Sequence, residues 1–144
     1  MSGERVFKYV GTRPIRHDGL DKVTGRANYG ADFTLPGLLH GYVLRSPHAH
    51  ARIMSIDTSA ADGMPGVKAV ITGADIPKTT GVVLLGEEGR YDLGDMGDNL
   101  LAHDTALYEG HAVAAVAATS VEIARNAAER IIVHYKNLPP VLTI

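Results

Sequence analysis

A run of small apolar residues, Ala112–Ala118, constrains the fold of this chain more than any other segment. The run holds only alanine and valine, whereas a strand with one wet face alternates apolar and polar side chains. It is far too short to cross a membrane. We therefore expect a central β-strand that other elements cover on both faces.

A helix is expected to follow this strand directly. Thr119 and Glu122 have the spacing of a capping box, in which a hydroxyl and a carboxylate bond the free amides of a helix start. Apolar side chains then recur every four residues, as on one face of a helix. The period changes to two at residues 131–136, before two prolines that cannot donate to a sheet. The sequence thus predicts a main helix at about residues 120–130 between two strands.

The middle of the chain predicts shorter elements. Residues 39–45 and 51–56 both alternate like strands, and we expect them to pair with each other. Asp57 suits the N-cap of a short helix at about residues 59–63. The β-branched residues 67–72 predict a further strand. The predicted class is therefore α+β, with a mixed sheet, one main helix and one short helix.

Two segments lack a sustained period. Residues 1–38 are interrupted by glycine and proline throughout, so we expect an extended arm packed on a single domain that spans residues 39–144. Residues 78–105 are rich in glycine and acids, which predicts a long loop. Charge is uneven: residues 1–26 hold six Lys or Arg and three acids, and residues 87–109 hold seven acids and one Arg.

Composition excludes several classes of function. The chain has no cysteine, which removes disulfides, thiolate metal sites and cysteine-ligated clusters. The basic start is not clustered or interleaved with aromatics, so we expect no nucleic-acid partner. The sequence has no apolar stretch long enough for a membrane span and begins without the pattern of a secretory leader, so a cytoplasmic location is the expectation.

Two groups of side chains invite a metal. His48 and His50 share one face of an extended chain, but no third ligand completes a known spacing, so hydrogen-bonded structural histidines are the favoured interpretation. Asp92, Asp95 and Asp98 recur every three residues, yet they miss the spacing and the closing glutamate of a calcium loop. A solvated acidic loop is expected there.

Motifs for catalysis are missing from the sequence. No serine sits in a Gly-x-Ser-x-Gly turn, and no phosphate-binding glycine loop of the nucleotide-binding types is present. The many acids lie in polar, glycine-rich surroundings without apolar walls to raise a pKa. We therefore assign no catalytic, cofactor-binding or metal-ligating residue, and we expect a domain that holds something rather than one that reacts.

Six phrases, in one order, carry a family resemblance: residues 21–32, 45–53, 55–60, 65–67 with 72–77, 110–118 and 135–141. Together they resemble the α/β hammerhead domain that opens the molybdenum-binding large subunit of the xanthine dehydrogenase and aldehyde oxidase family. The likeness runs from about Val10 to Leu142 and is strongest to the bacterial branch, near 4-hydroxybenzoyl-CoA reductase and carbon monoxide dehydrogenase. It implies the hammerhead fold.

The resemblance also implies a function. The parent enzyme is expected to be an oxidoreductase that uses molybdenum–molybdopterin on xanthine, aldehyde or aromatic substrates, with [2Fe–2S] clusters and FAD on other domains or subunits. The family's catalytic glutamate and pterin-binding segments lie outside the matched phrases. This chain is then a scaffold and substrate-channel domain, inactive alone, whose partners are the rest of the molybdenum subunit and the iron–sulfur and flavin subunits. Association of the chain into a homo-oligomer is a further expectation.

The resemblance transfers one segment to the substrate channel: Thr80 and Gly81, followed by Val82 and Val83. The alternative is that these valines only anchor the base of a loop. A second function stays open, a stand-alone binding or adaptor module that holds a metal through its histidines. An apolar surface patch is expected around the arm and residues 78–105.

The resemblance includes three further residues, to which we assign structural roles. We expect Gly110 to permit close backbone approach, and His50 and His111 to pin neighbouring loops by hydrogen bonds.

Overall fold

The computed structural model describes residues 7–84 and 89–143. The chain divides into two compact units, Met1–Pro36 and Gly37–Ile144. The predicted packing of an arm, residues 1–38, on a domain of residues 39–144 stays a prediction. Parts of the predicted arm (1–6) and of the predicted loop (85–88) lie outside the described residues.

From residue 7 on, the first unit holds two short helices, α1 (Gly19–Val23) and the 3-10 helix η1 (Gly30–Asp32), and neither buries a residue. In α1, Lys22 and Asp18 form an ion pair with Nζ and Oδ2 2.9 Å apart. The exposed large apolar side chains of this unit are Phe7, Tyr9, Val10, Ile15, Leu20, Val23, Tyr29, Phe33 and Leu35. Within this unit these side chains are exposed, and the apolar patch expected around the arm stays a prediction.

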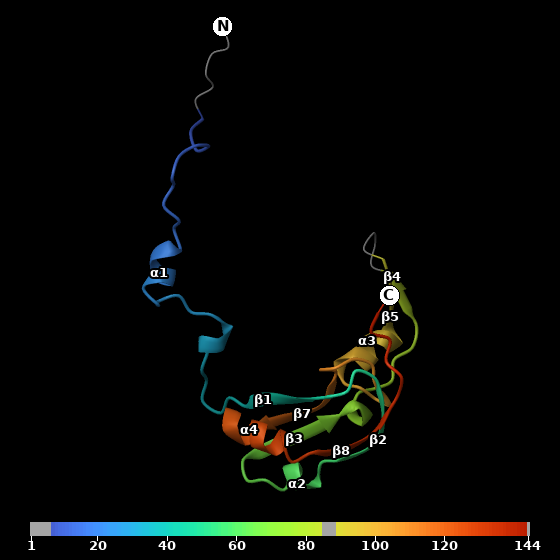
Figure 1. Ribbon diagram of the computed structural model, residues 1–144. Coiled ribbons are helices and arrows are strands. Elements are labelled where there is room, and N and C mark those ends of the chain that lie inside the picture. The colour runs from blue at the N-terminus through green and yellow to red at the C-terminus, as the bar shows by residue number, and fades with distance from the viewer. Residues whose placement is uncertain (1–6, 85–88, 144) are drawn as a thin grey trace. The chain divides into compact units, whose positions relative to one another are not determined.

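The core of the second unit lies on a three-stranded antiparallel sheet (Figure 1), in the order β1 (His40–Arg45), β7 (Ala112–Ala118) and β3 (Val67–Thr72). The expected central position of Ala112–Ala118 is confirmed, but the expected cover on both faces is wrong, since Ala115 and Ala117 stay partly exposed on the face away from the helices. One face of β7 packs against two helices in the hydrophobic core, whose buried members are Ala61, Ala114, Val116, Ala127, Ala128 and Ile131.

A second antiparallel sheet has the order β6 (Thr105–Ala106), β2 (Ala51–Asp57) and β8 (Ile132–Asn137). The predicted pairing of residues 39–45 with 51–56 is therefore wrong. The backbone of Ser46 bonds instead to His111 and Gly110, at 2.8 Å each, which holds β1 beside β7 and sends the next strand into the other sheet. The α+β class is confirmed, but three small antiparallel sheets replace the expected mixed sheet in the described residues.

The two predicted helices are confirmed with different caps. The main helix, α4 (Val121–Ala128), is capped by Ser120, whose hydroxyl accepts the amide of Ile123 at 3.2 Å, and not by Thr119 as expected. The short helix, α2 (Ser59–Asp62), has Thr58 at the N-cap position. Asp57, the predicted N-cap, lies one residue before the N-cap position, and its Oδ1 accepts the amide of Ser59 at 3.0 Å.

Removing the Ser120 hydroxyl should weaken the chain measurably. Ser120→Ala is expected to lower the free energy of unfolding by about 1 kcal/mol, because the amide of Ile123 loses its acceptor. Thr119→Ala is the matched control and should change it by less than about 0.5 kcal/mol. Urea unfolding followed by circular dichroism measures both. A larger loss for Thr119→Ala than for Ser120→Ala would contradict this assignment.

The predicted loop of residues 78–105 is ordered on both sides of residues 85–88, and this part of the prediction is wrong. It contains the hairpin β4 (Val82–Leu84) with β5 (Arg90–Asp92), then α3 (Leu93–Leu100). A 3-10 turn, η2 (Gly73–Asp75), precedes it. In the described part of the chain, no helix has the length and apolarity that crossing a membrane requires.

Candidate functional site

The residues predicted for a substrate channel lie at the base of the β4–β5 hairpin. The carbonyl of Gly81 accepts the amide of Leu93 at 2.9 Å, and Gly81 has a φ of +115°, a conformation that suits glycine. Val82 and Val83 pair with Asp92 and Tyr91 across the hairpin. Their side chains remain 41% and 37% exposed. The structure thus brings this segment to the surface beside α3.

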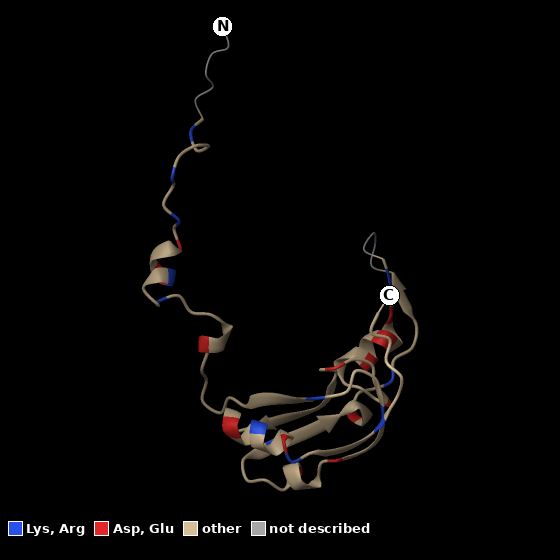
Figure 2. Ribbon diagram, in the orientation of Figure 1, with Lys and Arg blue, Asp and Glu red and all other residues tan. Residues whose placement is uncertain are grey.

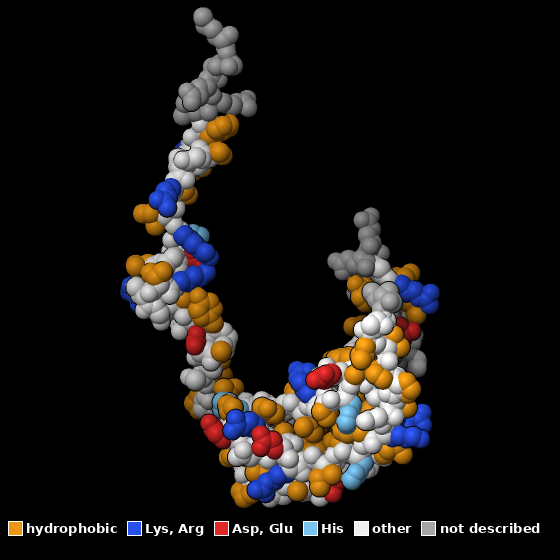
Figure 3. All heavy atoms as spheres, in the orientation of Figure 1, with side chains coloured by type: hydrophobic (Ala, Val, Ile, Leu, Met, Phe, Trp, Pro, Cys, Tyr) orange, Lys and Arg blue, Asp and Glu red, His pale blue; other side chains and the backbone are white. Residues whose placement is uncertain are grey.

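An apolar cavity of about 310 Å³ opens beside this hairpin, and almost no polar surface lines it. Its walls come from α3 and from the segment that leads into β4: Ile76, Pro77, Thr79, Leu93, Met96, Gly97 and Leu100. Met96 and Leu100 are also exposed beyond the cavity. Figure 3 shows hydrophobic side chains gathered over α3 and the hairpin. This end of the domain is therefore an apolar, accessible surface.

Small residues let α3 approach the segment before β4. The hydroxyl of Thr79 donates to the carbonyl of Leu93 at 2.7 Å. A Cβ on the buried Gly97 would lie 3.3 Å from that hydroxyl oxygen, tighter than ordinary van der Waals contact. The two glycines of α3 thus serve close packing, although glycine disfavours a helix.

Two histidines fix the end of α3 to the rest of the domain. His103 Nδ1 lies 2.7 Å from Asp98 Oδ1, and its Nε2 lies 3.1 Å from the carbonyl oxygen of Ile76. His111 is fully buried; its Nδ1 accepts the amide of Leu107 at 3.1 Å, and its Nε2 lies 2.8 Å from the carbonyl oxygen of Asp98. The expected pinning role of His111 is confirmed, whereas His103 was not predicted.

Gly110 has a different role from the one predicted. It has a φ of +88°, and a Cβ built on it would meet no atom within 4 Å. Close approach is therefore not the reason for a glycine here; the left-handed turn is. Its carbonyl accepts from Arg45 Nη1 at 2.8 Å, so the turn also ties the end of β1 to the start of β7.

The three aspartates that suggested a calcium loop lie at and within α3, where Figure 2 shows acids gathered. Asp92 caps the helix, and its Oδ1 accepts the amide of Gly94 at 2.8 Å. The prediction of a solvated acidic loop is thus wrong, because the segment is a helix. Asp92 caps this helix, and Asp98 is bonded to His103.

His48 and His50 have separate structural contacts. The ring of His48 meets Tyr135 edge-on, with centroids 4.8 Å apart, and its amide donates to the Ser46 hydroxyl at 3.1 Å. His50 Nδ1 lies 2.9 Å from the carbonyl oxygen of Pro139, which confirms its expected pinning role. Burial raises the pKa of Tyr135, and a hydrogen bond with Ser46 opposes that rise. Among the described residues, no three His, Asp or Glu side chains come together as metal ligands.

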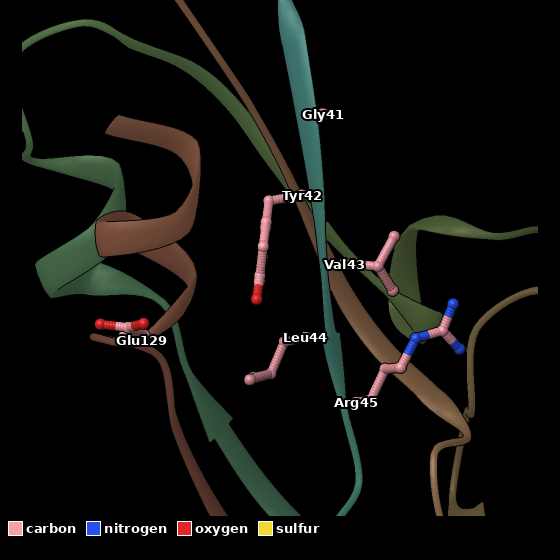
Figure 4. Close-up of a pocket in the computed structure, with 6 residues that line it drawn as sticks. All are labelled: Gly41, Tyr42, Val43, Leu44, Arg45 and Glu129. Carbon is pink, nitrogen blue, oxygen red and sulfur yellow. The ribbon is translucent and has the colours of Figure 1, made fainter. Parts of the chain in front are cut away.

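A larger, open cavity of about 580 Å³ lies along β1 and the C-terminal end of α4. Figure 4 shows Tyr42 and Leu44 on the side of β1 that faces α4 and Glu129, with Val43 and Arg45 on the opposite side. The cavity lies at an edge strand and offers one carboxylate, one phenol and one guanidinium, the last two on opposite sides of β1. It therefore has no arrangement for acid–base chemistry, and the apolar end at α3 is the better candidate.

Sequence reasoning missed the apolar residues of α3. Leu93, Met96 and Leu100 follow the i, i+3, i+7 spacing of an amphipathic helix, directly after a capping aspartate. That pattern could have revealed the helix. The glycines at positions 94 and 97 obscured it, because their reason is a tertiary contact.

Comparison with known proteins gives a consistent result. Residues 24–139 match the family model described as aldehyde oxidase and xanthine dehydrogenase, a/b hammerhead domain. The chain is 42% identical over 124 residues to a probable xanthine dehydrogenase subunit of Bacillus subtilis (strain 168), covering 86% of this chain and 15% of that protein. It is 38% identical over 140 residues to the carbon monoxide dehydrogenase large chain of Afipia carboxidovorans, covering 96% and 17%.

Solved structures agree. Quinoline 2-oxidoreductase from Pseudomonas putida 86 superposes with a TM-score of 0.75 at 40% identity, over 90% of this chain and 16% of that one. The aldehyde oxidoreductase of Desulfovibrio gigas gives a TM-score of 0.70 at 34% identity, over 86% and 14%. The chain therefore spans about a sixth of the length of these proteins.

Proposed function

The chain belongs to the a/b hammerhead domain family of aldehyde oxidase and xanthine dehydrogenase, and from this premise we propose that it is a scaffold and substrate-channel domain of a molybdenum-dependent oxidoreductase. It shapes one wall of the path to the reacting centre and part of an interface, and it is not catalytic by itself. We further propose that its source organism is a bacterium and that the chain is cytoplasmic. The related proteins named above include bacterial enzymes, which supports the first of these two points.

One observation carries this proposal beyond the family match: the apolar end formed by β4, β5 and α3. It combines the cavity beside α3 with exposed valines at the hairpin base, and Leu84 is 73% exposed. A monomeric domain rarely presents such a surface unless a ligand or a partner uses it. A channel wall requires apolar groups on a rigid scaffold. The contacts of His103 and His111 with Asp98 hold α3 rigidly in place.

The donor groups of this chain do not fit a resident metal or iron–sulfur cluster. The chain has no cysteine, and in the described ranges no cluster of three ionisable ligands forms. We therefore assign molybdenum–molybdopterin, the [2Fe–2S] clusters and FAD to polypeptide other than these 144 residues. The partners are then the rest of the molybdenum subunit and the iron–sulfur and flavin subunits or domains. Self-association through the apolar surfaces is a further consequence.

Within the channel, Thr80, Gly81, Val82 and Val83 form the proposed contact segment. The hairpin places Val82 and Val83 next to each other on a surface strand, where adjacent side chains point to opposite faces. Only one of the two valines therefore faces the channel, and the other packs against the neighbouring polypeptide.

A larger side chain in place of the channel-facing valine should exclude bulky substrates more than small ones. In the enzyme complex that contains this chain, Val82→Phe or Val83→Phe is expected to lower kcat/KM for a bulky aromatic aldehyde by about tenfold or more, with a much smaller change for acetaldehyde. Met54→Phe, at an exposed position of β2, is the control. Steady-state kinetics with both aldehydes measures the ratio. Parallel changes for both substrates in both valine variants, no different from the control, would refute the channel assignment.

A further inference from the structure

The sheet β1-β7-β3 has one covered face and one open face. On the covered face, Ala114, Val116 and Ala118 of β7 are buried, and the first two belong to the core below α4 and α2. Of the alternate residues, which point to the other face, Val113 is fully buried, whereas Ala115 and Ala117 stay partly exposed, so this face is open over the second half of β7. The two faces of β7 thus differ in burial, although the side chains on both are apolar.

Strand register defines the open face as six residues in two rows. One row crosses the sheet as Val43, Ala115 and Ile71, and the other as Gly41, Ala117 and Ala69. None of the six is polar or charged. Val43 and Ile71 are 38% and 40% exposed. Figure 4 shows Val43 pointing from β1 to the side away from α4.

Such a face is unlike a solvated sheet surface. An antiparallel sheet that meets water on one side ordinarily carries polar residues at the outward positions. Here the six residues of the two rows are apolar, and the charged Arg45, on the same side of β1 as Val43, lies outside those rows, with its Nη1 bonded to the Gly110 carbonyl. The open cavity at Gly41 and Val43 continues the surface around the edge of β1. Another element is needed to cover it.

The size and shape of the open face select its occupant. A stable interface between free proteins uses about 20–30 residues on each side, so six small residues are too few to hold a second copy of this chain. In the relatives this domain makes up 15% and 17% of a longer polypeptide, which can supply a covering element without a separate binding step. In the row Val43–Ala115–Ile71 a small side chain stands between two larger ones, a pattern that favours an elongated occupant lying along β7, such as a helix.

We propose that the open face docks the apolar stripe of an α-helix from the molybdenum-binding polypeptide of the same enzyme; this rests on the proposed function. Gly41, Ala69 and Ala117 let the helix backbone come close to the sheet, and Val43 and Ile71 flank it. The stripe that meets these six residues is apolar, because none of the six can pair with a charge; the guanidinium of Arg45 lies beside them on the same side of β1. The docking surface is separate from the channel end at α3.

Footprinting and one charge substitution test this docking. With the tagged chain in its enzyme complex, carbene labelling of Val43 and Ile71 should fall at least fivefold below that of the isolated chain, while exposed Met54 changes little. In the complex, Ala69→Lys should raise the carbene labelling of Val43 and Ile71 at least threefold relative to Ala60→Lys, a substitution at a matched exposed alanine in α2. The melting temperature of the isolated Ala69→Lys chain should match that of the wild type, which shows that its fold is intact.

A cross-link identifies the occupant. A photoreactive p-benzoylphenylalanine at position 69 should join to residues of the molybdenum polypeptide that are three or four apart, as on one helix face. Cross-links to a second copy of this chain, to an iron–sulfur or flavin subunit, or to residues two apart as in a strand would overturn the proposal. So would unchanged labelling of Val43 and Ile71 in a molybdenum-containing complex. A complex without molybdenum would instead count against the proposed function, whatever the labelling.

Discussion

Replacing His111 by leucine is expected to lower the free energy of unfolding by about 3 kcal/mol, the largest effect of a side chain in this domain. The ring is fully buried, and it bonds the amide of Leu107 and the carbonyl of Asp98 at 3.1 and 2.8 Å. Leucine has a similar size but leaves both backbone groups without a partner. Both bonds are partly buried, and a buried group left unpaired costs about 1–3 kcal/mol.

The matched control is His134→Leu, at an exposed position of β8, which should change stability by less than about 0.5 kcal/mol. Urea unfolding followed by fluorescence and circular dichroism measures both variants. Because His111 links the start of β7 to the end of α3, amide hydrogen exchange should also rise across α3 in His111→Leu. A loss below about 1 kcal/mol would show that these bonds do not hold α3 in place.

Gly73→Ala should be nearly as damaging, for a steric reason. A Cβ at the buried Gly73 would collide with the carbonyl oxygen of Ala102, and it would lie 2.8 Å from the Ala102 carbonyl carbon and from the His103 Cα. These are backbone atoms, and the amide of Ala102 is bonded to the carbonyl of Ala112 at 2.8 Å, so the segment cannot move freely. Overpacking of this kind costs about 1–3 kcal/mol, and we expect the upper end.

Gly41→Ala provides the comparison, because its Cβ would have only one neighbour, the Val116 carbonyl oxygen at 4.0 Å. That variant should be neutral or more stable by up to about 1 kcal/mol. Thermal and urea unfolding of both variants test the pair. Equal stability of Gly73→Ala and Gly41→Ala would mean that the Ala102–His103 backbone yields easily, and it would weaken the case that this region is a rigid scaffold.

Local patterns in the sequence predicted the local structure well. The Ala112–Ala118 run, the helix after it and the next strand are found where expected, since each depends on neighbours a few residues away. Pairing was not predictable in the same way. Residues 39–45 alternate as a strand should, but alternation does not say which strand lies beside them, and the bonds from Ser46 to the start of β7 decide it.

The apolar end at α3 was the hardest part to predict. Gly94 and Gly97 disfavour a helix by intrinsic preference, and only the contact with Thr79 explains them. The resemblance named Thr80–Val83 without the helix that supports them. The cap shift from Thr119 to Ser120 has a similar origin: only Thr119 has a glutamate three residues on, yet the backbone geometry makes Ser120 the cap.

The central claim is that this chain scaffolds a molybdenum enzyme and holds no reacting centre itself. The most direct measurement is molybdenum per chain, by mass spectrometry, together with aldehyde and xanthine turnover, for the purified 144-residue chain and for the complex recovered with it. We predict no molybdenum and no turnover in the chain alone, and both in the complex. Stoichiometric molybdenum or turnover in the chain by itself, or a complex that lacks molybdenum, would contradict the account.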